Sequence, residues 1–567
     1  MAPARLRVCA QSTGSSKDNG NSWIEIPVPD AAEWGTNHVS RRSPSALDPI
    51  IKVMPAFWLA LVCLIPIGAA IANRLPIPNA VIWVLLGVAV AFVPGVPALP
   101  LNPKIALFLV LPPLVYASAV QLPWPEFRAN LRPIALLAIG LVLASTVAIA
   151  VFAHWVAGLP WPAAFVLGAV VSPTDPVAAS AVASQSGLPR RLVAILEGEG
   201  LVNDGVALSL FRIALAASAG HEFSAGSGLF RLLAILLAEP LYGWGLGIVV
   251  AWIRGRIRDP LIEITVSLLT PFAAYLVPEH FGGSGILATV AVGMYIGERS
   301  PTLVPAGTRL HATSFWQMIV FLLNAFLFIS AGMQLRQIIA SEHGGMRVLQ
   351  WGLAMGAAVA AVRIAWCALS WYGFHALQAA LGRGRGAETW RGMVVIAWSG
   401  MRGPISLAAA FSIPASMGTA PFPDFQLVVF LTAAVIVVTL VVQGGGLPWL
   451  IRLLGISRAA DAELEELRRQ ELLGEREAAR AALKCLSELE LDGEAPPDAA
   501  ERLRRHYKEL ERQADGLSAG RLDARARSKL LGAERARILQ LRNEGRITDY
   551  ALERLQRTLD LRESLLE

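Results

Sequence analysis

A succession of long apolar runs between residues 54 and 456 constrains this chain more than any other feature. Each run has the roughly 20 residues that an α-helix needs to cross the hydrocarbon of a bilayer. We therefore predict an all-α, polytopic membrane protein, and the runs indicate about thirteen spans. The predicted spans are 54–73, 78–95, 103–121, 132–157, 161–184, 190–218, 229–253, 261–279, 283–298, 313–335, 348–374, 390–414 and 425–453.

The arginines in the short loops predict the orientation. Basic residues concentrate in cytoplasmic loops, and with this span count they fall in every second loop. The predicted inner loops hold Arg74, Arg128, Arg132, Arg190, Arg191, Arg254, Arg256, Arg258, Arg299, Arg309, Arg383, Arg385 and Arg391, whereas the outer loops hold only Lys104, Arg336 and Arg347. We expect a multi-pass inner (plasma) membrane protein with its N-terminus outside and its C-terminus in the cytoplasm.

Composition agrees with this class and excludes others. The chain is 54% hydrophobic and only 16% charged, whereas soluble domains carry about 25% charged residues. The net charge of +6 comes from loop arginines, so we expect no nucleic-acid partner. The four cysteines are scattered without a metal-like or paired spacing, and we expect no cofactor. No zinc-protease motif, phosphate-binding loop or paired Ser/Lys or Ser/His site is present, so an enzyme is not expected.

The chain divides into three parts. Residues 1–52 are polar and are predicted to be a disordered N-terminal extension without a signal-peptide core; Met54 is an alternative start. Residues 53–456 form the membrane region. Residues 457–567 are rich in Leu, Ala, Glu and Arg and are predicted to be a cytoplasmic tail of charged helices. A solvated appendage and a regulatory tail are both compatible with this composition.

The fifth span contains an ionisable residue that a membrane helix rarely tolerates. Asp175 stands in VVSPTDPVAAS between Pro173 and Pro176, and two prolines so close together should open the helix. Unwound backbone at membrane depth is found where it lines a cavity or is buried in protein, and such discontinuous helices mark the binding sites of transporters. We therefore predict that Asp175 and Thr174 belong to a cation site, rather than to a merely kinked helix.

The sixth span contains four polar residues in one apolar segment, LEGEGLVNDGVALSLF. Glu199 and Asn203 share a helix face, whereas Asp204 lies about 140° from Glu199 and can face another neighbour. A buried carboxylate can bind either a proton or a cation, because the empty charged form is costly. Asp204 is therefore the predicted exchange site, with Glu197 as an accessory residue. The alternative is that these residues only hold helices together.

The twelfth span contains Arg402 in IAWSGMRGPISLAAA, where Gly400, Gly403 and Pro404 should interrupt the helix. A buried arginine needs a carboxylate partner, and we predict a structural ion pair with Glu199, or in second place with Glu197. The two interrupted spans lie in different halves of the membrane region, which favours inverted repeats with two broken, crossing helices. Two further charges at membrane depth, Arg363 and Glu239, are interpreted as structural, although Glu239 before Pro240 could line a cavity.

Six stretches resemble the monovalent cation:proton antiporter-1 family of sodium/proton exchangers. They are FLVLPPLVYAS (108–118), SPTDPVA (172–178), EGEGLVNDG (197–205), SGILATVAVGMYIG (284–297), FLLNAFLFISAG (321–332) and AWSGMRGP (397–404). Together they cover the membrane region in order. The end of the tail, ERLQRTLDLRESLLE, resembles the bacterial members of this family.

The resemblance implies a homodimer in which a moving core domain works against a fixed dimer domain. It also implies that Asp175 and Asp204 bind the cation, helped by the Thr174 carbonyl, and that Glu199 pairs with Arg402. Asn203 stands where electrogenic relatives carry a second Asp, which implies electroneutral exchange of one proton per cation. Two positions depart from the family pattern: Gly200 replaces a serine ligand, and Ala117 and Ser118 replace an acidic residue. Ser118 is therefore an accessory ligand candidate.

These observations predict a secondary antiporter that exchanges Na⁺ for H⁺ by alternating access, with the lipid bilayer, cations and protons as its partners. Li⁺ and K⁺ are possible substrates, and the departures at Gly200 and Ala117 keep a K⁺/H⁺ antiporter open as the alternative. A cation channel is the remaining transport alternative, and it would require a continuous pore.

Overall fold

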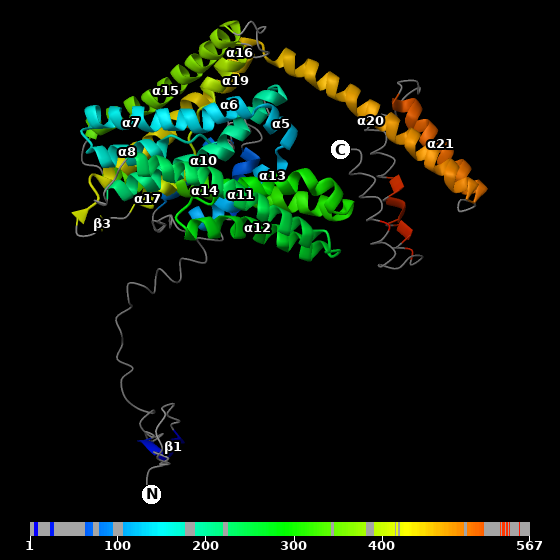
Figure 1. Ribbon diagram of the computed structural model, residues 1–567, viewed down its shortest axis with the longest axis horizontal. Helices are drawn as coiled ribbons and strands as arrows, with labels where there is room; N and C mark the ends of the chain where they lie inside the picture. The colour runs from blue at the N-terminus through cyan, green and yellow to red at the C-terminus, as the bar shows by residue number, and fades with distance from the viewer. Residues whose placement is uncertain are drawn as a thin grey trace.

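The computed structural model shows a bundle of packed helices from which a long helical tail extends (Figure 1). It describes residues 5–9, 23–27, 63–71, 79–93, 106–175, 187–218, 225–341, 345–380, 390–413, 416–417, 420–492 and 496–514, with scattered positions between 533 and 555.

The membrane region is helical almost throughout these residues, with three wide π-helical turns, η2, η3 and η4. Its elements are α2 (Asn79–Ala91), η2 (Ala106–Val110), α4 (Leu111–Gln121), α5 (Trp124–Ala129), α6 (Leu131–Ala135), η3 (Leu136–Leu141), α7 (Val142–Ala157), α8 (Trp161–Val171), α10 (Arg190–Ser218), α11 (Ala225–Arg254), α12 (Pro260–His280), α13 (Ile286–Leu303), α14 (Ala306–Ser341), α15 (Gly345–Ala380), α16 (Trp390–Trp398), α17 (Pro404–Phe411), α18 (Phe425–Val438), η4 (Thr439–Gly444) and α19 (Gly445–Leu454).

The all-α, polytopic class predicted from the sequence is confirmed. Seven helices of the described part are long and apolar enough to cross a membrane, and three shorter apolar helices accompany them. The count of about thirteen spans stays a prediction, because parts of the first three predicted spans and the second half of 161–184 lie outside the described residues. The seven long helices are Leu131–Ala157, Arg190–Ser218, Gly226–Arg254, Pro260–His280, Gly307–Leu335, Met346–Ala376 and Phe425–Leu454.

The helices pack in two neighbouring groups. One joins α4, α11, α12 and α13, and the other joins α7, α8, α10, α15 and α18. Glycines allow the closest approach in the first group. A Cβ on Gly297 of α13 would lie 2.3 Å from the Val120 carbonyl oxygen, and one on Gly293 would lie 2.7 Å from the Ala119 Cβ. Such small-residue faces are the usual means of close helix packing in membranes, and they give α13 and α4 a fixed contact.

Two short antiparallel hairpins accompany the helices. Near the N-terminus, β1 (Arg5–Cys9) pairs with antiparallel β2 (Trp23–Pro27), with Leu6 opposite Ile26 and Val8 opposite Ile24. This differs from the disorder predicted for residues 1–52, because alternating apolar residues in both stretches support a hairpin. The rest of that segment lies outside the described residues. A second short hairpin, β3 (Ser416–Met417) and β4 (Ala420–Pro421), lies between α17 and α18.

The tail consists of two helices that fold back on each other. α20 (Ser457–Leu491) leaves the bundle, and α21 (Pro497–Ala514) returns along it (Figure 1). Arg480 on α20 binds Glu511 on α21 at 2.7 Å, and Arg504 binds Glu490 nearer the turn. The charged helices predicted for this region are therefore present in its first 58 residues, 457–514. Most of the remaining tail lies outside the described residues.

Candidate functional site

Two interruptions of helices meet in the interior of the bundle. α8 ends at Val171, and the residues from Pro173 to Asp175 are not helical; the continuation past Asp175 lies outside the described residues. The second interruption spans 399–403, between α16 and α17. Prolines explain both, since Pro173 cannot donate to the preceding turn and Pro404 is favoured at the first position of a new helix. Both interruptions were predicted from the sequence.

The two interruptions contact each other directly. The Asp175 backbone N–H donates to the Met401 carbonyl at 2.8 Å, and Arg402 Nε donates to the Val171 carbonyl at 2.8 Å. Gly403 approaches Asp175 so closely that a Cβ there would lie 2.6 Å from Asp175 Oδ2. The backbone groups that each helix leaves unpaired at its break are therefore partly satisfied by the other break, as buried backbone requires.

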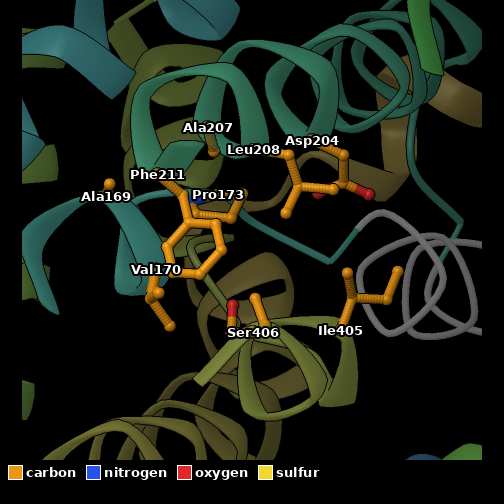
Figure 2. Close-up of a pocket in the computed structure, with 10 residues that line it drawn as sticks. Ala169, Val170, Pro173, Asp204, Ala207, Leu208, Phe211, Ile405 and Ser406 are labelled. Carbon is orange, nitrogen blue, oxygen red and sulfur yellow. The ribbon is translucent and has the colours of Figure 1, made fainter. Parts of the chain in front are cut away.

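Asp204 lies on α10 beside this crossing. Its side chain is only 6% exposed, and it lines a small cavity with Pro173 and residues of α8, α10 and α17 (Figure 2). The space open to the centre of a water-sized sphere is about 10 Å³, which is close to the minimum for one water molecule. Asp175 is half-buried and near enough to interact electrostatically with Asp204. The structure thus brings the two predicted carboxylates to one place.

Thr174 and Asn203 connect the break to α10. Asn203 Nδ2 donates to Thr174 Oγ1 at 2.7 Å and approaches the Thr174 carbonyl at 3.3 Å. The Thr174 hydroxyl donates in turn to Glu199 Oε1 at 2.9 Å. Among the described residues, Asn203 Oδ1 is buried without a hydrogen-bond partner. An oxygen of this kind beside Asp204 suits a cation or a bound water.

The prediction that Glu199 pairs with Arg402 is wrong, because the partner of Glu199 is Arg363. Glu199 binds Arg363 of α15 through both carboxylate oxygens, with Arg363 Nη2 at 2.8 Å from Oε2. The Arg363 Nε also donates to the Ile396 carbonyl at 3.1 Å. Glu199 is 1% exposed and Arg363 is fully buried. Because nearly every polar atom of this pair has a partner, the cost of desolvating the two charges is offset.

Arg402 has a different role in the structure. It is fully buried, and its guanidinium binds the carbonyls of Val171 and Gly400, while its backbone N–H donates to Thr439 Oγ1 at 3.1 Å. Val171 is the last residue of α8, and the C-terminal end of a helix favours a positive charge. Arg402 therefore satisfies carbonyl groups at both breaks through Nε and Nη1, while its Nη2 is buried without a hydrogen-bond partner among the described residues.

The sequence held a signal for Arg363 that we interpreted only as structural. Between Arg347 and Arg383 it is the one residue among Asp, Glu, Lys and Arg, and a lone charge in an apolar span usually has a buried partner. Its partner could not be read from the sequence, since Glu199 is 164 residues away along the chain and only helix packing brings the two together.

Three other polar residues lie apart from the cavity. Glu239 accepts hydrogen bonds from the backbone N–H groups of Ser284, Gly285 and Leu287 at 2.5–3.3 Å, so it caps α13 and is not among the lining residues. Ser118 and Glu197 are half-buried, and neither is among the residues that line the cavity beside Asp204. Their accessory roles stay predictions.

Comparison with known proteins decides the family. The family model for the transmembrane sodium/hydrogen exchanger matches residues 59–453, which includes both breaks and all of α10. The chain belongs to the sodium/hydrogen exchanger family. The match ends before α20, so the tail helices lie beyond the family's transmembrane region.

Relatives of this sodium/hydrogen exchanger extend over most of its length. An uncharacterized Na⁺/H⁺ exchanger of Mycobacterium tuberculosis is 34% identical over 524 residues, which cover 89% of this chain and 95% of that protein. A sodium, potassium, lithium and rubidium/H⁺ antiporter of Bacillus pumilus is 31% identical over 89% of this chain and 77% of its own. The sodium proton antiporter MjNhaP1 of Methanocaldococcus jannaschii has the same fold, with a TM-score of 0.57, 20% identity, and coverage of 72% of this chain and 100% of its own.

Proposed function

We propose that this exchanger moves Na⁺ against H⁺ across the plasma membrane, with Asp204 and Asp175 as the shared binding site. The observation that carries the proposal is the burial of Asp204 beside a cavity where two broken helices cross. A carboxylate in such a place is stable when it is protonated or holds a cation, because an uncompensated charge in a low dielectric is costly. The family of the chain supports the same assignment.

The mechanism we infer is alternating access. The site crosses the membrane only when Asp204 carries a cation or a proton, since moving an empty pair of carboxylates through a low dielectric is unfavourable. Asp175 supplies a second carboxylate to the cation, and the carbonyl of Thr174 and the Oδ1 of Asn203 are further oxygen ligands within reach. The proton gradient then drives Na⁺ outward, and no resident cofactor takes part.

The polar network behind the site supports a stoichiometry of one proton per cation. Asn203 is an amide whose Nδ2 is held by Thr174, and an amide cannot take up a proton at this position. Glu199 is held as an ion by Arg363. Asp204 is therefore the group that takes up the proton, while Asp175 stays a charged ligand in both loaded states. One proton then replaces one Na⁺, which favours electroneutral exchange.

The name of one relative bears on the range of cations. The Bacillus pumilus relative is named for sodium, potassium, lithium and rubidium. We propose Na⁺ as the principal substrate with Li⁺ and K⁺ as further ones, and K⁺/H⁺ exchange as the second candidate function. Neither requires a different site.

The family of the chain bears on its oligomeric state, and the charges of the loops bear on its orientation in the membrane. We propose a homodimer in the plasma membrane, with residues 53–456 as the exchanger domain and residues 457–567 as a cytoplasmic tail. Basic residues in the alternate loops support a cytoplasmic C-terminus and an external N-terminus.

Purified protein in proteoliposomes tests the proposal. Na⁺ added outside should alkalinise the lumen of wild-type vesicles, because one H⁺ leaves for each Na⁺ that enters, and clamping the membrane potential should not change the rate. Asp204→Asn should abolish this movement, whereas Asp259→Asn, at the exposed N-terminal cap of α12, should leave it intact. Normal exchange by Asp204→Asn would refute the site, and large currents through wild type would favour a channel.

A further inference from the structure

The cavity beside Asp204 has a second polar wall. Of the ten side chains that line it, eight are apolar or proline, and the other two are Asp204 and Ser406. Asp204 lies on α10 and Ser406 on α17, on opposite sides of the cavity in Figure 2. Ser406 is 3% exposed. A hydroxyl in this position lies next to whatever occupies the space at Asp204.

The Ser406 hydroxyl differs from those of other serines near the crossing. Ser172, Ser209, Ser399 and Ser412 each donate to a carbonyl of their own helix at 2.7–2.9 Å. Within the described part of the chain no such bond from the Ser406 hydroxyl is found, although its backbone N–H reaches the Gly403 carbonyl at 3.3 Å. A buried hydroxyl that is not bonded to its own helix is available to a ligand.

We propose that the Ser406 hydroxyl is an oxygen ligand of the cation, directly or through one bound water, when the cation is held by Asp204. The inference rests on the proposed function and adds a residue to its site. Hard cations are held by several oxygen ligands, and Gly200 of α10 has no side chain to supply one. Ser406 supplies a hydroxyl from the facing half-helix instead.

The location of Ser406 in α17 gives a physical reason for a hydroxyl ligand at this position. It lies in the first turn after Pro404, where the positive end of the helix dipole disfavours a cation. A hydroxyl lone pair aimed into the cavity offsets part of this effect. Through one water in the cavity, the same hydroxyl can accept a hydrogen bond when Asp204 is protonated or donate one when Asp204 is ionised, so it fits each loaded state of the site.

Two variants at position 406 with side chains of the same shape separate the effect of the hydroxyl from the effect of packing. Ser406→Thr keeps the hydroxyl, and Ser406→Val replaces it with a methyl group. In proteoliposomes we expect Ser406→Val to raise the apparent KM for Na⁺ about fivefold, as the loss of one hydrogen-bond-strength contact predicts. Ser406→Thr should stay within about twofold of wild type. Ser412→Ala, which removes a hydroxyl bonded to its own helix, should have no effect.

Direct binding provides a readout that does not need transport. Thermal unfolding in detergent should show Na⁺-dependent stabilisation of wild type and Ser406→Thr, shifted to higher Na⁺ concentration in Ser406→Val. If Ser406→Val does not fold, Ser406→Ala removes the hydroxyl with less bulk. Equal Na⁺ dependence in the Val and Thr variants would overturn the ligand role while leaving the exchanger intact. A wild type that moves no protons with any cation would instead overturn the proposed function.

Discussion

The charged residues at the crossing have different partners. Glu199 is held by Arg363 and Thr174, and we propose that Asp204 and Asp175 bind the exchanged ions. Arg402 binds backbone carbonyls rather than a carboxylate. A fully buried ion pair such as Glu199–Arg363 is expensive to break from one side, because the remaining charge has no compensation. Its role here is to hold Thr174 at the break.

Breaking this ion pair should therefore destabilise the protein strongly. Glu199→Gln leaves the buried Arg363 uncompensated, and we expect a loss of about 3–5 kcal/mol. Glu279→Gln is the matched control, because its bond to Arg212 at 3.1 Å lies in a pair that is 22–28% exposed, and such pairs contribute about 1 kcal/mol or less. Thermal unfolding in detergent measures both. Equal shifts in the two variants would show that the Glu199 pair has no special weight.

At the scale of elements, the crossing depends on how closely two broken helices approach. Gly403 is the point of contact, since a Cβ there would lie within 3 Å of three Asp175 side-chain atoms. Its backbone is extended, with φ of −108°, so an alanine at this position is limited by space and not by backbone strain. A side chain here has to displace Asp175.

Gly403→Ala should consequently impair exchange. We expect a fall of at least about tenfold in the exchange rate, because a misplacement near 1 Å at a binding site costs this much or more. Gly445→Ala is the control, since a Cβ at Gly445 meets nothing within 4 Å. Initial rates in proteoliposomes at matched protein density compare the two. If Gly403→Ala exchanged at the wild-type rate, the close contact with Asp175 would have no functional weight.

The helices and the breaks could be predicted from the sequence, whereas the contacts between helices could not. The apolar run at 190–218 predicts the bounds of α10, and Pro173, Gly403 and Pro404 indicate where two spans are interrupted. The pairing of Arg363 with Glu199 and of Arg402 with Val171 depends on which helices are neighbours. Nothing local encodes these neighbours. The position of Arg402 in its span and the family resemblance predict Glu199 as its partner, and that prediction is wrong.

A contact between the tail and α10 links two elements that are far apart in the chain. The Glu463 carboxylate of α20 accepts from the Arg190 backbone N–H at 3.0 Å. Arg190 is the first residue of α10, so this N–H has no partner within its own helix. A negative charge at a helix N-terminus is favourable by about 0.3–1 kcal/mol. The tail thus holds one end of the helix that carries Asp204.

Removing the charge of Glu463 should loosen α20 from the bundle. Glu463→Gln keeps an acceptor but loses the charge, so the detached state should become about two- to fivefold more populated. Limited trypsin digestion should then cleave α20 faster. Glu465→Gln, an exposed change two residues along the same helix, serves as the comparison. Identical cleavage rates in the two variants would mean that Glu463 does not hold the tail.

For the whole molecule, we propose that one buried site serves both ions. We propose that Na⁺ and H⁺ exclude each other at Asp204 and Asp175, because Asp204 lines the cavity at the crossing and Glu199 is already paired with Arg363. Mutual exclusion has a kinetic consequence, because protons on the face where Na⁺ binds reduce the fraction of sites open to it. Saturating Na⁺ should overcome this competition fully.

The most direct test is the apparent KM for Na⁺ in proteoliposomes, measured at several pH values of the face that binds Na⁺. We expect KM to rise as pH falls, by up to about tenfold per pH unit, while the maximal rate at saturating Na⁺ stays constant. A maximal rate that falls with acidification at unchanged KM would mean that protons act elsewhere, and it would contradict a shared site at Asp204 and Asp175.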